Sequence, residues 1–441
     1  MRTSLAVLVA KTVQWAMKGF GYRAGTLPGR LALMIDPQLF AHLSYPKERI
    51  FITGTNGKTS VNNITSQLLI HSGYAVVCNH YGDNLDWGLA STMIDKATLS
   101  GRLKGDILCC EVDELTVVKL VDVIHPTMLV INNFFRDQLD RVGEMDTLIA
   151  LFEKKLQSYT GRLILNSNDP NVNRLALSAP LATRLNYGVE PSAEIISKDS
   201  EIGEGTRCPL CFKELVYSAR YYSHIGVYAC PEHTDLMRRP DLLATQVSLS
   251  ENRFVLNGET YPLMYNLTYS VFNQLAALSV ASCFDVDPET ARQVFASFRL
   301  ENGRMESFTI REGRNCILNL AKNPAGASEI IKFVRRYNHD HVLLSILNDN
   351  DADGTDVSWI WDTPYQDLIT PSTQMILCSG KRAYDMAIRF RYTGFDMSRI
   401  AVIEDKAEAV KALSTYDMDS FVLSNYTALQ ATRKELEKIA L

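Results

Sequence analysis

The segment from Gly54 to Thr59 reads Gly-Thr-Asn-Gly-Lys-Thr and has the residue types that bind a nucleoside triphosphate. Glycines let the backbone turn tightly, so that successive N–H groups and the N-terminus of a following helix face an anion. Lys58 would neutralise the β- and γ-phosphates, and the Thr59 hydroxyl would hold Mg²⁺. The loop is shorter than the general pattern, which requires a glycine at the position of Ile52. The residues predicted to bind ATP here are Gly54, Thr55, Asn56, Gly57, Lys58 and Thr59.

The elements on either side of this loop are those that a phosphate loop needs. The apolar run Arg49–Thr53 is typical of a buried strand and leads directly into the loop. After the loop, Val61, Ile64 and Leu68 recur at helical spacing, and the helix is expected to close near Gly73. This strand–loop–helix context disfavours the alternative, in which Gly-Lys-Thr lies by chance in a surface turn.

Two acids follow the next buried run, Ile107–Cys110. A carboxylate at the tip of a strand beside the phosphate loop could bind the metal, so Glu111 is predicted to share Mg²⁺ with Thr59. The alternative is that Glu111 and Asp113 only cap the helix that follows.

A second candidate metal site consists of Cys208-Pro-Leu-Cys211 and Cys230-Pro-Glu-His233, with eighteen residues between the two pairs. Three thiolates and one imidazole at this spacing can surround Zn²⁺ as a tetrahedron. Because no position stays open for a substrate, such a site would be structural. His224 is the alternative fourth ligand. The alternative without a metal is that the three thiols are unrelated and the histidine lies at the surface.

The residues between the two pairs are expected to form a small β-ribbon from Glu214–Val216 and Ile225–Tyr228. The six other cysteines, such as Cys109 and Cys110 in a buried strand, are interpreted as core residues.

The chain as a whole has the organisation of a multidomain α/β protein. Its 441 residues suffice for two to four domains, and its net charge of −5 gives no bulk basic charge that would favour nucleic acid. Apolar runs alternate with helical segments, which predicts mostly parallel sheets covered by helices, with a second doubly wound domain from about residue 301. The predicted strands further along the chain are Thr127–Ile131, Arg162–Leu165, Ile317–Leu320, His341–Leu347, Met375–Cys378, Ile400–Ile403 and Phe421–Leu423.

Residues 1–35 contain five basic residues and no acid. One helix is predicted here, with Lys11, Gln14 and Lys18 on the face opposite its apolar residues. Either the apolar face packs on the body of the protein, or the basic face meets an anionic ligand or a membrane surface. The apolar residues at helical spacing are Leu5, Leu8, Val9, Val13, Ala16, Met17 and Phe20. The run Leu5–Ala10 is too short to span a membrane and lacks a signal-peptide cleavage site, so a cytoplasmic protein is expected.

Asp349, Asp351 and Asp353 are spaced like the opening of an EF-hand calcium loop. Calcium is rejected because the twelfth position is Ile360 rather than glutamate, and because a strand precedes the loop. The alternative is a solvated loop, but the adjacent Ser358–Trp361 segment could dock a partner.

Several segments resemble the Mur ligases and folylpolyglutamate synthetases, in the order that this family has. Besides the phosphate loop these are Asn166–Pro170, Asn273–Ala277, Gly303–Glu306 and Asn319–Pro324. The resemblance implies a central ATPase domain and a C-terminal Rossmann-like domain, with Asn273 contacting adenine and Arg304 stabilising the transferred phosphoryl group. The sequence departs from the family at Gln138, where the ligases have a metal-binding histidine. The implied domains are an N-terminal basic segment 1–45, an ATP-binding domain 46–300 with its zinc insertion at about 205–235, and a C-terminal domain 301–441.

Within this family, the cysteine insertion, Asn132–Gln138 and Asp353–Asp362 resemble the subgroup that forms the synthetase subunit of amidotransferases acting on lipid II. The resemblance implies a heterodimer with a GatD-type glutaminase, and amidation of the D-glutamate α-carboxyl of the membrane-anchored lipid II stem peptide. Asp356 would then complete the glutaminase catalytic triad across the interface. The chain would act at the inner face of the membrane in peptidoglycan synthesis.

The residues themselves support ATP-dependent formation of an acyl phosphate, which ammonia or an amine would attack. A glutaminase needs a Cys nucleophile with a His base, and the sequence contains no Gly-x-Cys-x-Gly elbow, so any glutamine must be hydrolysed by a partner. Two alternatives are a self-contained ligase that adds an amino acid, and a scaffold that has lost its chemistry. The presence of Lys58, Thr59 and Glu111 argues against the scaffold.

Overall fold

The computed structural model describes residues 2–22, 25–135, 145–197, 206–298, 303, 305–310, 313–351 and 353–440. These residues form two compact units that divide after Phe298. The first unit includes the N-terminal helices, and the second begins at Gly303 among the described residues.

The first unit is built on a nine-stranded sheet of order β11-β10-β9-β6-β5-β4-β1-β3-β2. The seven strands from β9 to β2 in this order pair in parallel. Strands β10 and β11 extend the sheet beyond β9 by antiparallel pairing. The strands are β1 (Glu48–Thr53), β2 (Val76–Cys78), β3 (Ile107–Glu111), β4 (Met128–Ile131), β5 (Arg162–Asn166), β6 (Thr183–Val189), β9 (Leu242–Ser248), β10 (Arg253–Leu256) and β11 (Glu259–Pro262).

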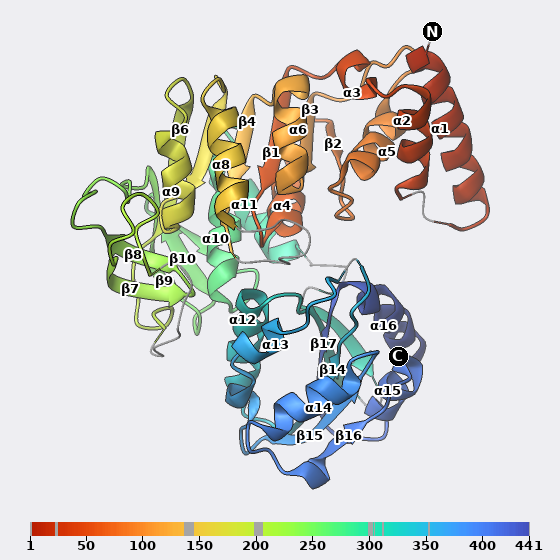
Figure 1. Ribbon diagram of the computed structural model, residues 1–441, viewed down its shortest axis with the longest axis vertical. Helices are drawn as coiled ribbons and strands as arrows, with labels where there is room; N and C mark the ends of the chain where they lie inside the picture. Colours follow the sequence, from red (N-terminus) through yellow and green to blue (C-terminus); the bar gives the residue numbers. More distant parts are fainter. Residues whose placement is uncertain are drawn as a thin grey trace. The chain divides into compact units, whose positions relative to one another are not determined.

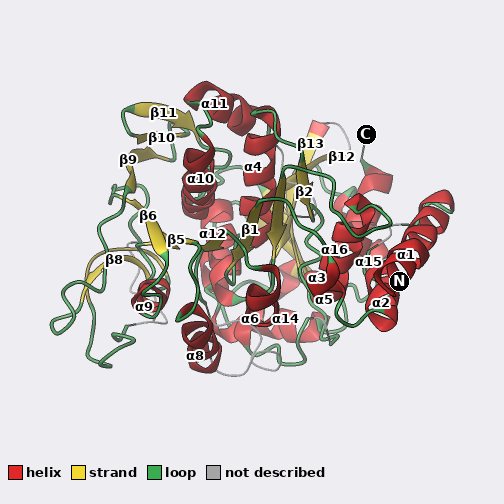
Figure 2. Ribbon diagram, turned by 90° about the horizontal axis from the view of Figure 1, so that it is seen from above, coloured by secondary structure: helices red, strands yellow, loops and turns green. Residues whose placement is uncertain are grey.

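Helices cover both faces of this sheet, as Figure 2 shows: α4, α10 and α11 lie on one side, and α6, α8 and α9 on the other. The strands β1, β3 and β4 are buried along almost their whole length, which explains their continuous apolar runs. The helices are α4 (Lys58–His71), α5 (Asp86–Lys96), α6 (Glu114–Ile124), α8 (Met145–Leu156), α9 (Pro170–Leu177), α10 (Thr268–Ala281) and α11 (Pro288–Ser297).

The register of the central strands brings the predicted chemistry to one edge of the sheet. Strand β1 pairs with β3 so that Ile52 lies beside Glu111, and with β4 so that Thr53 lies beside Ile131. The phosphate loop after β1 therefore lies next to Glu111 and to the residues that follow β4.

A separate two-stranded antiparallel ribbon consists of β7 (Val216–Tyr222) and β8 (Ile225–Ala229). The predicted first strand, Glu214–Val216, was placed too early, because Glu214 makes only an isolated bridge with Arg207 and the strand begins at Val216. The second predicted strand is correct in position.

Three helices precede the sheet: α1 (Arg2–Gly19), α2 (Leu27–Ile35) and α3 (Leu39–His42). The predicted orientation of α1 was wrong, since Gln14 is buried and donates to the Ser91 carbonyl, 2.8 Å away. Leu5 and Leu8, which were predicted to pack on the body, are instead exposed to solvent. The helix buries its small residues, Ala6, Val7 and Ala10, which allow close approach to α2 and α5.

The second unit contains a six-stranded sheet of order β12-β13-β17-β14-β15-β16, parallel except for β12. One apolar core lies under α12, α13 and α14 and another under α15 and α16, so the sheet is covered on both faces (Figure 1). The strands are β12 (Glu306–Ile310), β13 (Arg314–Leu320), β14 (His341–Ile346), β15 (Thr373–Ser379), β16 (Ile400–Val402) and β17 (Asp419–Ser424). The helices are α12 (Pro324–Arg335), α13 (Trp359–Asp362), α14 (Ala383–Arg391), α15 (Lys406–Leu413) and α16 (Tyr426–Ile439). Among the described residues, no helix has the length and apolar character needed to cross a membrane.

Candidate active site

The backbone of the phosphate loop depends on two glycines with positive φ, Gly54 at +122° and Gly57 at +85°. A Cβ atom on Gly54 would lie 2.8 Å from the carbonyl oxygen of Asn133, and one on Gly57 would collide with the side-chain oxygen of Asn273. Gly57 is also the N-cap of α4, so the loop leads straight into the N-terminus of this helix. The loop therefore has the backbone that anion binding at a helix N-terminus requires.

Lys58 is buried at the start of α4 and is held on two sides. Its Nζ atom donates to the carbonyl of Gly54 at 2.7 Å and forms an ion pair with Glu114 Oε1 at 2.9 Å. Glu114 is the first residue of α6 and is itself buried. A buried ammonium requires a charged partner, and Glu114 supplies it from the first turn of α6.

Thr59 and Glu111 border one small space that is left open by a glycine. A Cβ atom on Gly82 would lie 3.4 Å from Thr59 Oγ1 and 3.5 Å from Glu111 Oε1. Glu111 is 1% exposed, and its Oε1 accepts a hydrogen bond of 3.0 Å from Asn84. A hydroxyl and a carboxylate facing one space are oxygen donors of the kind that Mg²⁺ prefers, so these residues fit the predicted metal. Asp113 caps α6, since its side chain accepts from the Leu115 N–H.

The segment after β4 binds the phosphate loop through a set of short polar contacts. Asn133 accepts from the Asn56 N–H at 2.9 Å and donates to the Asn56 carbonyl at 3.1 Å. Thr55 Oγ1 accepts from the Phe135 N–H at 3.0 Å. The buried Asn132 side-chain nitrogen would lie 3.3 Å from a Cβ atom on Gly57 and has no hydrogen-bond partner in the described part of the chain. An amide donor at this point is suited to a phosphate oxygen.

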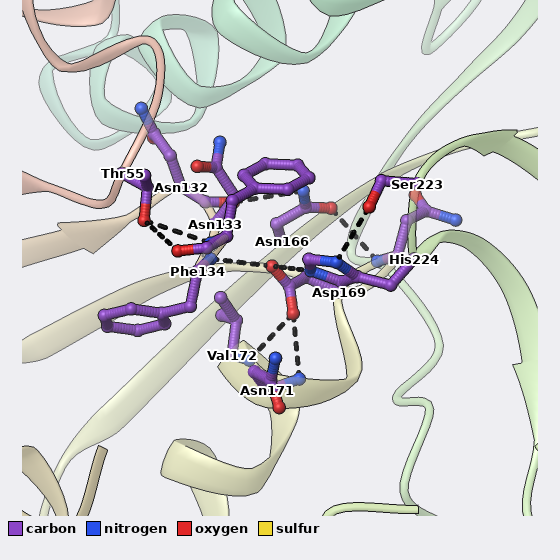
Figure 3. A network of polar contacts seen from close by, with 12 residues as sticks. Thr55, Asn132, Asn133, Phe134, Asn166, Asp169, Asn171, Val172, Ser223 and His224 are labelled. Atoms are coloured by element: carbon purple, nitrogen blue, oxygen red, sulfur yellow. Dashed lines mark hydrogen bonds and ion pairs between the residues drawn. The ribbon is translucent and has the colours of Figure 1, made fainter. Parts of the chain in front are cut away.

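Behind these contacts lies a buried carboxylate network, shown in Figure 3. Asp169 accepts from the Phe134 N–H at 3.0 Å and caps α9 by accepting from two of its N–H groups. His224, in the turn between β7 and β8, places Nε2 3.2 Å from Asp169 Oδ2, and both side chains are fully buried. His224 also packs against the ring of Phe135, with ring centroids 4.6 Å apart. The tip of the β-ribbon therefore supports the segment that holds the phosphate loop.

This network settles where the two histidines of the insertion lie. The possible ligand atoms of Cys208, Cys211, Cys230 and His233 all lie within 4.8 Å of one another, whereas His224 is engaged with Asp169. His233 Nδ1 is 3.7 Å from both the Cys208 and the Cys230 sulfur. The structure thus brings together the four predicted ligands, with His233 rather than His224 as the fourth.

One thiol of this cluster, Cys230, differs from the core cysteines in acidity, whereas burial raises the pKa of its neighbour Cys208. Burial acts to raise the pKa of Cys230, but the N–H groups of Glu232 and His233 and the His233 ring outweigh it and lower this pKa to about 6. Burial raises the pKa of Cys109 and of Cys110 well above that of an ordinary thiol. A thiolate, the metal-binding form, is therefore accessible at neutral pH in the cluster, and the two strand cysteines are inert.

In the second unit, the two neighbouring aspartates have different surroundings. Asp353 is buried and accepts from both the N–H and the hydroxyl of Thr427, in the first turn of α16. Asp356 is exposed, and its Oδ1 accepts from the Ser358 N–H at 2.8 Å. Asp349 forms an ion pair with Arg382. Among the described residues these acids do not form one cluster, so Asp353 has a structural role, whereas Asp356 lies at the surface.

Comparison with known proteins agrees with this geometry. Residues 52–214 match the Mur ligase middle domain, and residues 320–429 match the MurT ligase C-terminal domain. The chain is 30% identical to the MurT subunit of the glutamine-hydrolysing lipid II isoglutaminyl synthase of Streptococcus pneumoniae, over 99% of this chain and 97% of that protein. This chain belongs to the MurT family. It is accordingly a ligase-family enzyme.

Solved structures confirm the predicted fold class of this MurT-family chain. The pseudomurein peptide ligase type C of Methanothermus fervidus aligns with a TM-score of 0.70 at 21% identity, covering 91% of this chain and 81% of that one. A folylpolyglutamate synthase of Mycobacterium tuberculosis aligns with a TM-score of 0.60 at 16% identity, covering 98% of both chains. These likenesses concern the fold alone.

Arg304, a predicted residue of the MurT-family site, lies outside the described residues, as does Gln138, which stands where the ligases have a metal-binding histidine. Asn273, predicted to contact adenine, lies on α10 with its side-chain oxygen against Gly57. Sequence reasoning missed Glu114 and Gly82. The sequence did contain a signal for Glu114. This acid follows the predicted strand Ile107–Cys110, and an acid at the start of the helix after a neighbouring parallel strand can reach Lys58.

Proposed function

We propose that this chain catalyses the ATP-dependent amidation of the D-glutamate α-carboxyl of the lipid II stem peptide, with ammonia from a partner glutaminase. The observation that carries the proposal is the convergence of Lys58, Thr59 and Glu111 at the carboxyl edge of β1 and β3. The choice of substrate rests on the name of the pneumococcal relative, a subunit of lipid II isoglutaminyl synthase.

Separate tasks are proposed for the predicted site residues. The N–H groups of the loop and Lys58 bind the phosphates of ATP, and Arg304 is proposed to stabilise the charge on the transferred group. Thr59 and Glu111 would hold Mg²⁺, which neutralises phosphate charge when it is bound. Asn273 is proposed to contact the adenine ring.

The reaction is proposed to proceed in two steps that balance. A carboxylate oxygen attacks the γ-phosphorus, and the bond between that phosphorus and the β–γ bridging oxygen breaks, which gives an acyl phosphate and ADP. Ammonia then attacks the acyl carbon, loses a proton, and inorganic phosphate leaves with one oxygen that came from the carboxylate.

A labelling experiment tests this order of events. Substrate whose acceptor carboxylate carries heavy oxygen is incubated with the heterodimer, ATP and ammonium salt. Transfer of one heavy oxygen to the released phosphate is the expected result. Phosphate that contains no heavy oxygen, while amide still forms, would exclude the acyl phosphate.

The proposed partner is a GatD-type glutaminase that binds the second unit and uses Asp356 as the third member of its catalytic triad. A glutaminase Cys–His pair needs a carboxylate that orients the histidine, and Asp356 is exposed while Asp353 is buried.

Trp361 and Tyr392, with rings 5.5 Å apart, lie in an exposed apolar patch with Tyr384 and Ile388 on α14. Such a patch favours a protein interface. Of the three apolar residues in the predicted docking segment, Trp361 is exposed, whereas Ile360 is buried and Trp359 packs against the core.

We further propose that the four-residue cluster of the insertion holds a structural Zn²⁺. Its ligands, Cys208, Cys211, Cys230 and His233, fill a tetrahedral shell and leave no open position. The metal would fix the base of the ribbon whose tip carries His224.

Zinc analysis of two histidine variants tests this assignment. The wild-type chain is expected to contain about one zinc per molecule, and His233→Ala, like Cys208→Ser with Cys211→Ser, is expected to lose it. His224→Ala should keep the metal but lower the free energy of unfolding by about 2–4 kcal/mol, because it removes a buried side chain that bonds to Asp169. A wild-type chain that contains no metal and is nevertheless fully stable would contradict the assignment. Loss of zinc in His224→Ala, while His233→Ala keeps it, would contradict it as well.

A further inference from the structure

Helix α1 carries an apolar stripe on the face that points away from the protein. Leu5, Leu8 and Trp15 lie in one row at helical spacing and are 53%, 49% and 79% exposed. We call these three residues the outer stripe. The buried face of α1 is formed instead by Ala6, Val7, Ala10 and Gln14. Figures 1 and 2 show α1 at the margin of the first unit, beyond α2.

The exposure continues beyond the end of the helix. Phe20 and Tyr22 are 80% and 69% exposed, and Met34 on α2 is 72% exposed. Soluble proteins rarely leave large apolar side chains in such density on one element without a partner. No interaction of this chain described above uses the outer stripe.

The charges around the stripe determine the kind of partner. Residues 1–35 contain Arg2, Lys11, Lys18, Arg23 and Arg30 and no acid. Two acids from neighbouring elements contact α1: Asp95 of α5, which pairs with Lys18 at 2.9 Å, and the buried Asp36, which accepts from the Thr3 hydroxyl. Lys11 donates to the carbonyl of Asp95. The described basic residues of the segment, Arg2, Lys11, Lys18 and Arg30, outnumber these two acids, so this surface is net positive although the whole chain is net negative. An apolar row with aromatic residues and flanking basic residues is the pattern of a helix that lies in the plane of an anionic membrane surface.

We propose that the outer stripe of α1 inserts into the interface of an anionic lipid bilayer, with the basic residues of the N-terminal segment against the lipid headgroups. This deepens the proposed function and rests on it for its purpose, since a substrate that is anchored in a bilayer must be met at the bilayer surface. Binding itself is independent of substrate, so it can be measured without any amidation assay.

Sedimentation of the full chain with vesicles tests the proposal. The chain is expected to bind vesicles of equal parts phosphatidylglycerol and phosphatidylcholine, to bind phosphatidylcholine alone far less, and to dissociate as salt is raised. The double variant Leu8→Glu with Trp15→Glu should reduce binding to the anionic vesicles about tenfold or more, since it replaces two inserted side chains by charges. Both positions are exposed, so the variant should unfold at the wild-type temperature.

The matched control is Leu181→Glu, which changes a leucine of 60% exposure in the same unit, outside α1 and α2, and should bind like the wild type. The proposal is overturned if the wild type binds neither vesicle, or if the double variant binds as well as Leu181→Glu. It is also overturned if the double variant instead abolishes self-association or glutaminase binding while vesicle binding persists, which would assign the stripe to a protein.

Activity assays separate this proposal from the proposed function. The double variant should amidate a lipid-free stem peptide at the wild-type rate and be slower only on substrate embedded in anionic vesicles. A wild-type chain that binds vesicles but amidates neither substrate would contradict the proposed function and leave membrane docking standing.

Discussion

Replacing Lys58 or Thr59 by alanine is expected to lower the rate of amidation about 100-fold or more. Lys58→Ala removes the positive charge that is proposed to neutralise the phosphates of ATP, and Thr59→Ala removes the hydroxyl that borders the space beside Gly82 together with Glu111. The rate of amide formation from ammonium salt measures the effect without involving the glutaminase.

Matched variants separate lost chemistry from lost folding. Thr59→Ser keeps the hydroxyl and should retain most activity. Lys58→Ala leaves Glu114 buried without its ion-pair partner, which is costly, so it is compared with Lys58→Ala combined with Glu114→Gln. Lys119→Ala, on the exposed face of α6, should have no effect. If either alanine variant is folded and works within threefold of the wild type, the phosphate loop is not where ATP binds.

Asp356→Asn is expected to abolish most glutamine-dependent amidation while ATP binding and assembly with the glutaminase persist. The carboxylate that is proposed to orient the glutaminase histidine becomes an amide, and loss of this orientation in a Ser-His-Asp triad reduces the rate by about 10⁴-fold. Ammonium salt should restore amide formation, because the phosphate loop is in the first unit and is unchanged.

Asp353→Asn provides the control for this variant, because Asp353 is close in sequence but bonds to Thr427. We expect it to lower stability and to leave more glutaminase activity than Asp356→Asn does. Full glutaminase activity in the Asp356→Asn complex would contradict the assignment. So would a complex that binds ATP but gains nothing from ammonium.

The elements that position the phosphate loop could be predicted from sequence because their signals are local. Strands such as β1 and β14 are buried on both faces and are therefore continuous apolar runs. Strands β9 and β10 were missed, because their buried residues alternate with exposed or half-buried ones and the apolar runs stay short.

The orientation of α1 could not be predicted, since apolar residues occur around most of its circumference. Periodicity favoured the larger residues, Leu5 and Leu8, as the buried face, but small Ala6 and Ala10 allow the closest packing against neighbouring helices. Which of two apolar faces is buried depends on the neighbours, and these are distant in sequence.

The residues of the candidate site that belong to one motif could be predicted from sequence. The contacts between residues far apart in the sequence were missed. Lys58 and Thr59 follow from one motif, but the partnership of Lys58 with Glu114 depends on the pairing of β1 with β3. Likewise, only the folded ribbon reveals that His224 meets Asp169 and leaves His233 for the metal cluster.

The central claim, that this chain transfers ammonia rather than an amino acid to the stem peptide, is tested most directly by one labelling measurement. The heterodimer is given ATP, Mg²⁺, lipid II and glutamine whose side-chain amide carries heavy nitrogen, and the product is analysed by mass spectrometry. The account predicts a single heavy nitrogen in a new amide at the D-glutamate α-carboxyl, with no residue added to the peptide. A product that has gained a whole amino acid, or an unlabelled peptide despite ATP hydrolysis, would contradict it.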